Sequence, residues 1–238
     1  MNTDAVRWLK FIIAILLLPA TAGITSVAWH ACHILLAGAN AVPALAFGAG
    51  YLFWLLIFIF LPTPVRTYVL GHELTHAIWA LLMGARVSGL SVRKSGGQVR
   101  TSKTNWAITL APYFFPFYAV LFMAGFFIAH AIWNLTAHFW VLFFLVGLGW
   151  SFHVTFTIMV LLTVSQPDVK SQGALFSAVV IYLMNLMTML VTAALLSQSL
   201  AFAALAQLFS DKLPASYVWT LDNCSVLWDY ARALWSQR

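Results

Sequence analysis

The chain has 238 residues, of which 63% are hydrophobic and only 8% charged, and its mean hydropathy is +0.91. A soluble single domain of this length does not carry so apolar a surface, so the composition predicts an all-α polytopic membrane protein. The net charge of +6 comes from twelve Lys and Arg residues against five Asp and one Glu. Five basic residues gather in one connection between apolar segments, which favours a lipid bilayer as the partner and not nucleic acid.

Six apolar segments are long enough to cross a bilayer as α-helices. The predicted spans, in chain order, are 11–36 with a kink near Pro19, 43–61, 65–82, 105–128 interrupted by Pro112 and Pro116, 139–162, and 174–196. A signal peptide also begins with basic residues and an apolar run, but the first run is too long for one. We expect a single membrane-embedded domain, 1–238, with its core at 65–196.

The connection after the third span, 86–104, is the one long polar segment between spans. Leu90 and Val92 alternate with polar residues on one side of Ser95-Gly96-Gly97, and Val99 and Thr101 do so on the other. This pattern predicts a short β-hairpin. The hairpin could add a strand to an unfolded substrate segment, or it could be a solvated loop, and both readings stay open.

The last segment, 211–238, is predicted to be an amphipathic helix lying at the membrane surface. Trp228 and Trp235 recur at helical spacing, while charged residues occupy other positions. A seventh span is the alternative, but Asp222 and Asp229 would interrupt it.

The most informative stretch is Gly71 to Met83, GHELTHAIWALLM. His72 and His76 are four residues apart, so on a helix they share one face and can hold one metal ion. Glu73 lies beside them and is the only glutamate in the chain. A carboxylate within hydrocarbon is costly, so a functional role is expected. The pattern predicts a Zn²⁺ site in which Glu73 is the catalytic base that activates a water molecule.

Other interpretations of the same residues remain. A match of five residues can arise by chance, and polar groups in a helix can simply be satisfied by neighbours. A membrane scaffold or a transporter could use the histidines and Glu73 to bind or relay ions, although no partner for the motif occurs in the other half of the chain. A zinc hydrolase acting on a lipid or a small amide is the third alternative.

The chain resembles the site-2 protease family of intramembrane zinc metalloproteases. The resemblance rests on GHELTHAIWALLMGARV, on the hairpin-like segment after it, and on NWAITLAPYFFP at 105–116, and it covers about 65–128, extending toward Gly173. It implies zinc bound by the two motif histidines, with the motif glutamate as catalytic base. It also implies cleavage of a peptide bond in or near the membrane, in a membrane protein or peptide substrate.

The third metal ligand is where the chain departs from that family. The family usually supplies an aspartate from a later Asp-Gly motif, and this chain has no Asp-Gly pair. His153 in the fifth span and Asp168 in the polar segment behind it could replace it. At about 1.5 Å per residue, the two histidines lie about 10 and 16 Å deep and His153 comes near the same depth. Asp168 would emerge on the opposite face unless its segment folds back, so the prediction is His153, with Asp168 as the alternative.

Two further predictions concern polar residues and location. Asn105 and Thr109 could donate hydrogen bonds to the oxyanion formed during hydrolysis, or they could cap a helix, and both readings stay open. Lys and Arg divide six to six between the two sides of the membrane, and their clustering in the hairpin tilts the prediction toward a cytoplasmic hairpin. We expect a multi-pass protein of a bacterial-type inner (cell) membrane.

Overall fold

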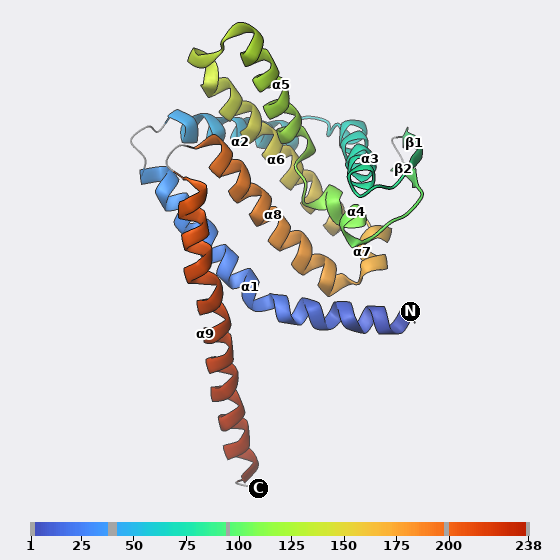
Figure 1. Ribbon diagram of the computed structural model, residues 1–238. Helices are drawn as coiled ribbons and strands as arrows, with labels where there is room; N and C mark the ends of the chain where they lie inside the picture. The colour runs from blue at the N-terminus through green and yellow to red at the C-terminus, as the bar shows by residue number, and fades with distance from the viewer. Residues whose placement is uncertain (1–2, 38–41, 94–95, 198–199, 237–238) are drawn as a thin grey trace. The chain divides into compact units, whose positions relative to one another are not determined.

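A computed structural model describes residues 3–37, 42–93, 96–197 and 200–236 (Figure 1). The protein is mostly helical, at 83%, with one small two-stranded sheet. In chain order the elements are α1 (Thr3–Ala37), α2 (Val42–Phe60), α3 (Val65–Leu82), β1 (Val87–Arg93), β2 (Gly96–Thr101), α4 (Trp106–Leu110), the 3₁₀ helix η1 (Ala111–Tyr113), α5 (Phe117–Trp133), the 3₁₀ helix η2 (Thr136–His138), α6 (Phe139–Thr163), α7 (Pro167–Gln172), α8 (Ala174–Leu196) and α9 (Phe202–Ser236).

Within the described residues, four segments are long and apolar enough to cross a membrane: α1, α2, η2 together with α6, and α8. A fifth candidate is the pair Trp106–Tyr113 and Phe117–Trp133, which is bent by 79° at a short break. Pro112 and Pro116 lie at that break, where proline removes a backbone donor and clashes with a continuing helix. The predicted interruption of this segment is confirmed, and the long apolar helices are compatible with a multi-pass membrane protein.

The remaining predicted span corresponds to α3, which has the predicted bounds but is not among the candidate membrane spans of the described chain. Its 18 residues include Arg66, His72, Glu73 and His76, and these lower its hydropathy. The structure therefore supports four to five spans, and the count of six is not confirmed.

The predicted hairpin is confirmed. Strands β1 and β2 pair antiparallel, with Leu90 opposite Val99 and Val92 opposite Gly97, and the register is irregular between Val87 and Gly89. Opposed residues of an antiparallel pair lie on the same face, so these four share one face of the hairpin. Lys94 and Ser95 at its tip lie outside the described residues.

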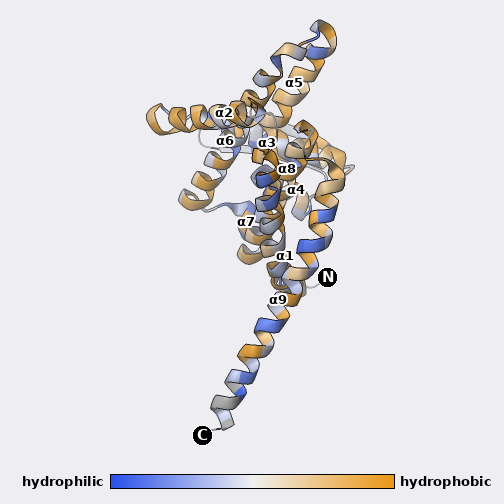
Figure 2. Ribbon diagram, turned by 90° about the vertical axis from the view of Figure 1, so that its left-hand side faces the viewer, coloured by the Kyte–Doolittle hydropathy of each residue, from blue (hydrophilic) through white to orange (hydrophobic). Residues whose placement is uncertain are grey.

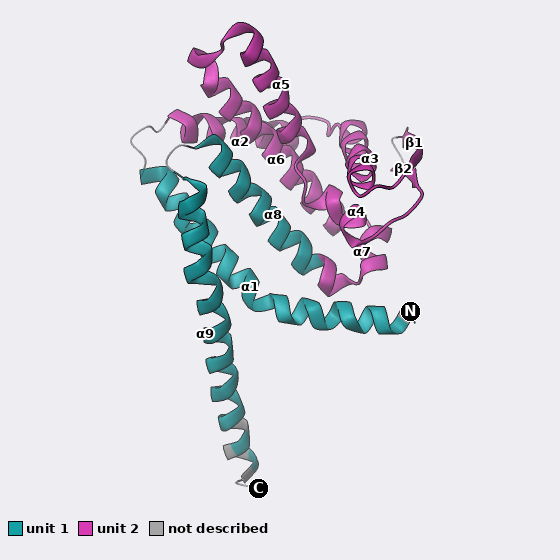
Figure 3. Cartoon of the chain, in the orientation of Figure 1, with its two compact units in different colours: residues 1–37, 178–238 teal, residues 38–177 magenta. Residues whose placement is uncertain are grey.

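The chain divides into two compact units, residues 1–37 with 178–238, and residues 38–177 (Figure 3). Helix α8 begins in the unit 38–177, and its residues from 178 onward belong to the other unit. The core predicted at 65–196 crosses this division, whereas His72, Glu73, His76, His153 and Asp168 all belong to unit 38–177.

In the unit formed by residues 1–37 and 178–238, α1 packs along α9. The Tyr217 hydroxyl donates to the Leu16 carbonyl at 3.0 Å, and Thr25 shares a hydrogen bond of 2.7 Å with Tyr182 of α8. Helix α1 bends partway along, and Pro19 lies inside it (Figure 1). Helix α9 begins at Phe202, before the predicted start at residue 211, and its C-terminal half mixes hydrophilic with hydrophobic residues (Figure 2).

In the unit formed by residues 38–177, α2, α5 and α6 pack closely because glycines let their backbones approach. A Cβ atom at Gly50 of α2 would fall on the carbonyl group of Phe144, and one at Gly149 of α6 would lie 2.6 Å from the Ala119 backbone nitrogen. Small residues at helix crossings are typical of packing in membranes. Helix α3 contacts α5 of this group.

Candidate metal centre

The two motif histidines and Glu73 lie on α3, as predicted. The helix begins directly after Pro62-Thr63-Pro64, and the Pro64 carbonyl accepts hydrogen bonds from the backbone of Thr67 and Tyr68. Proline fits this position because it has no N–H to leave unpaired and its backbone angle suits a helix start. The four-residue spacing then brings the His72 and His76 rings to 4.8 Å between centroids.

Asp168 joins these two histidines. Its Oδ2 atom lies 3.6 Å from Nε2 of His72 and 3.5 Å from Nε2 of His76. One ligand atom from each of the three residues lies within 4.8 Å of the others. Within the described residues, this is the group of His, Cys, Asp or Glu side chains that lie close enough together to share a metal ion. The cluster could hold a metal ion.

Asp168 reaches the histidines because the chain turns back after α6. Helix α6 ends at Thr163, Val164 and Gln166 are extended, and Pro167 begins α7. Helix α7 packs against α4, so Asp168 in its first turn returns toward α3. The depth estimate placed Asp168 across the membrane because it assumed that the chain continues straight out from α6. In the structure the segment does fold back toward α3, as the alternative prediction requires, and the role of Asp168 as a ligand stays a prediction.

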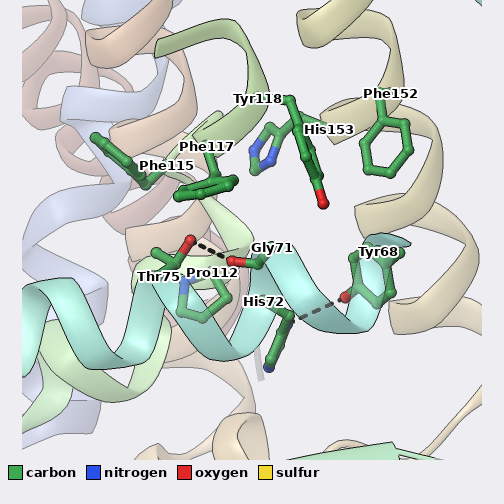
Figure 4. A pocket seen from close by; sticks show the side chains of 10 residues that line it. All are labelled: Tyr68, Gly71, His72, Thr75, Pro112, Phe115, Phe117, Tyr118, Phe152 and His153. Carbon is green, nitrogen blue, oxygen red and sulfur yellow. Dashed lines mark hydrogen bonds between the residues drawn. The ribbon is translucent and has the colours of Figure 1, made fainter. Parts of the chain in front are cut away.

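His153 does not belong to the group. It is buried in α6 and lines a pocket with Tyr68, Gly71 and His72 of α3 and with Phe117 and Tyr118 of α5. In Figure 4 the His72 ring points away from His153, on the other side of α3. The depth at which a residue lies in a membrane does not determine which side of a helix it faces.

The second ring nitrogen of each histidine has a hydrogen-bond partner. His76 Nδ1 lies 2.8 Å from the Ile108 carbonyl oxygen, and His72 Nδ1 lies 3.3 Å from the Tyr68 hydroxyl. A carbonyl oxygen only accepts, so Nδ1 of His76 carries the hydrogen, and Nε2 of neutral His76 presents a lone pair to Asp168. Such second partners orient the ligands of metal sites.

The resulting arrangement calls for a positive charge between the three residues. A lone pair on Nε2 and a carboxylate oxygen 3.5 Å apart repel each other unless a proton or a cation lies between them. Two imidazole nitrogens and one carboxylate oxygen are also the donor set of many catalytic zinc sites, which keep a further position open for water. The residues present therefore fit a zinc ion.

Asp168 lies in α7, outside the predicted membrane spans, and its pKa depends on burial and on the two histidines. Burial by itself raises the pKa of the carboxyl group, because the charged form loses solvation. When His72 and His76 are protonated, their hydrogen bonds and positive charge lower it by more, so the pKa lies well below the usual range for aspartate. Asp168 is ionised at neutral pH, and this is the form that binds a cation.

Glu73 lies under the hairpin and is only 6% exposed. Gly97 of β2 lies directly against its side chain: a Cβ atom there would be 2.6 Å from Oε1 and 2.7 Å from Cδ of Glu73. Only glycine leaves room for the Glu73 carboxylate in this position. The hairpin therefore covers the carboxylate that the sequence identified as the candidate base.

Asn105 is the N-cap of α4, as one of the two predictions held, and Thr109 bonds back to it from within the helix. The Asn105 side chain accepts from the Ile108 backbone at 2.9 Å, and the Thr109 hydroxyl donates to the Asn105 carbonyl at 2.8 Å. This cap starts α4, whose Ile108 carbonyl in turn contacts His76. The two residues thus help to position a candidate ligand.

The sequence interpretation missed Tyr113 and Gly97. Tyr113 is fully buried, and its hydroxyl contacts Asp168. A signal for it was present, since it is the one residue with an ionisable hydroxyl in the apolar stretch NWAITLAPYFFP. Gly97 was interpreted only as part of a turn. Comparison of the chain with protein-family models, with curated proteins and with solved structures found no match.

Proposed function

We propose that this chain is a membrane-embedded zinc endopeptidase of the site-2 protease type, which hydrolyses a peptide bond in or near the bilayer. The observation that supports the proposal best is the convergence of His72, His76 and Asp168, whose ligand atoms lie within 4.8 Å of one another. We assign Asp168 as the third ligand in place of His153, because only Asp168 faces both imidazoles.

The proposal includes a membrane topology. Helix α3 is proposed as a sixth span, placed in a bacterial-type cell membrane. Polar side chains at membrane depth are tolerated when they face protein or a cavity and not lipid. Glu73 and Thr75 of α3 are buried, and the His72 and His76 side chains are 11% and 14% exposed, which meets that condition.

The proposed reaction assigns a role to each residue. A zinc ion held by the three donors would supply Lewis-acid activation of a water molecule. With a metal held there, Glu73 would accept a proton from the attacking water molecule, whose oxygen would bond to the carbonyl carbon of the scissile amide. Glu73 returns the proton to the amide nitrogen as the C–N bond breaks, so one water is consumed for each bond cleaved.

The hairpin gives this reaction a substrate-binding element. A transmembrane helix must be opened before its peptide bonds can be attacked. An extended segment can pair with a strand edge through backbone hydrogen bonds. Because Gly97 of β2 lies against Glu73, a segment held beside this strand is close to the proposed base.

The test compares the purified full-length chain with Glu73→Gln. Zinc is measured by elemental analysis, and cleavage of single-span test substrates is followed over time. Because Glu73 is not a ligand, we expect zinc content to be retained while turnover falls by about 10²–10⁴-fold, the usual contribution of a general base. Chelation and zinc readdition should abolish and restore wild-type cleavage. Equal rates for the two proteins would refute the proposal.

A further inference from the structure

Tyr113 lies beside the candidate metal centre. It ends η1, at the break where the segment Trp106–Tyr113 meets Phe117–Trp133 at 79°. The side chain lies against α3, where the Tyr113 and His72 rings meet edge to face with their centroids 5.2 Å apart. The side chain is fully buried, so its hydroxyl is shielded from solvent next to the metal centre.

The Tyr113 hydroxyl contacts the same carboxylate oxygen that faces the two histidines. Its distance to Asp168 Oδ2 is 3.1 Å. A carboxylate oxygen has two lone-pair directions, so Oδ2 can accept from Tyr113 through one and present the other to His72 and His76. Such an arrangement holds Asp168 as a ligand through a single oxygen and limits rotation of the carboxylate.

Gln166 offers a second acceptor for the same hydroxyl hydrogen. The Tyr113 hydroxyl lies 3.1 Å from Oε1 of Gln166, and the Gln166 amide nitrogen donates to the Val164 carbonyl at 3.3 Å. Gln166 and Asp168 both belong to the segment that turns back after α6. Tyr113 thus ties this segment to the break between α4 and α5 at two points.

We infer that Tyr113 is a positioning residue of the metal centre, which fixes Asp168 as a single-oxygen ligand through its hydroxyl. The inference rests on the proposed function, because it assumes that zinc binds to His72, His76 and Asp168. Outer partners of metal ligands typically change metal affinity or activity by about 10–100-fold when they are removed. We expect removal of the Tyr113 hydroxyl to change zinc affinity by a factor of this size.

The test is Tyr113→Phe in the full-length protein, read without reference to activity. Zinc affinity is measured by competition with a chelating dye, and the visible absorption spectrum of the Co²⁺-loaded protein reports the geometry of the ligands. We expect zinc to bind about 10–100-fold more weakly and the Co²⁺ bands to shift, because the carboxylate gains freedom to rotate.

Tyr118→Phe is the matched control. Tyr118 lies in the pocket beside His153, and its hydroxyl donates to the Thr67 carbonyl, away from Asp168. Tyr118→Phe should keep wild-type zinc affinity and Co²⁺ bands. A thermal unfolding measurement on each metal-free variant identifies a loss of fold. Gln166→Leu supplies a second variant: it removes the competing acceptor, so the Tyr113 hydrogen goes to Asp168 alone, and the Co²⁺ bands should shift without a loss of zinc affinity.

The outcomes separate the inference from the function on which it rests. Wild-type zinc affinity and unchanged Co²⁺ bands in Tyr113→Phe would overturn the inference alone, as would equal changes in Tyr118→Phe. If Tyr113→Phe fails to fold, unchanged Co²⁺ bands or weaker zinc binding in Gln166→Leu would overturn it. Absence of stoichiometric zinc in the wild-type protein would overturn both, whereas zinc with unaffected turnover in Glu73→Gln would overturn the proposed function and leave the positioning role standing.

Discussion

The two sides of α3 differ in what they contact. On one side, His72, His76 and Glu73 meet Asp168 of α7 and Gly97 of the hairpin, which are residues of segments that connect helices. On the other side, residues of α3 meet aromatic side chains and His153, which come from the long helices α5 and α6 (Figure 4).

This difference separates the candidate chemistry from the packing. Connecting segments tolerate irregular backbone, so they can bring a carboxylate or a glycine to a chosen atom. Long helices in contact through glycines have little such freedom, and their polar residues mostly serve packing. We therefore expect substitutions on the connecting segments to change metal binding and turnover, and substitutions between the helices to change stability.

The largest effect should come from the two candidate third ligands. Asp168→Ala removes the oxygen that faces both imidazoles and should weaken zinc binding by more than about 100-fold, beyond the usual effect of an outer partner. His153→Ala should keep stoichiometric zinc. Zinc titration of both variants measures the difference. Stronger loss of zinc in His153→Ala would reinstate His153 as the ligand and refute the assignment of Asp168.

A smaller effect is expected from Gly97→Ala in the hairpin. The added methyl group would displace the Glu73 side chain, and misplacement of a catalytic group by about 1 Å can cost about 10²-fold in rate. Zinc content should not change. Gly89→Ala is the matched control, since a Cβ atom there meets only Arg100 Cδ at an ordinary 3.8 Å. Similar turnover of the two variants, measured with the same substrate, would contradict a role for Glu73 under the hairpin.

Local sequence patterns predicted much of the fold and brought together two of the three residues of the candidate metal centre. Apolar runs marked the long helices, alternation around Ser95-Gly96-Gly97 marked the hairpin, and spacing paired His72 with His76. These signals are local, because each one depends on residues within a few turns or along two adjacent strands.

The third residue of the candidate metal centre had no local signal. Asp168 meets the histidines because α7 packs on α4 and Tyr113 holds the returning segment, and both contacts join residues far apart in the sequence. The estimate from depth assumed straight helices in a flat slab, and such an estimate does not say which side of α3 a residue faces. The space that Glu73 needs beside Gly97 is likewise a tertiary property.

The smallest effect on zinc, and a clear effect on stability, is expected from Gly149→Ala on the packing side. The new Cβ atom would lie 2.6 Å from the Ala119 nitrogen and 2.7 Å from its Cα atom, and a backbone cannot move aside as a flexible side chain does. Overpacking of this kind typically costs about 1–3 kcal/mol. Gly125→Ala on α5 is the control, because no described heavy atom lies within 4 Å of its Cβ position. Unfolding in a detergent titration should separate the two variants, while zinc bound per folded molecule stays equal. If Gly149→Ala instead lost zinc without losing stability, the helix side of α3 would also carry the metal chemistry, and the division between the two sides would fail.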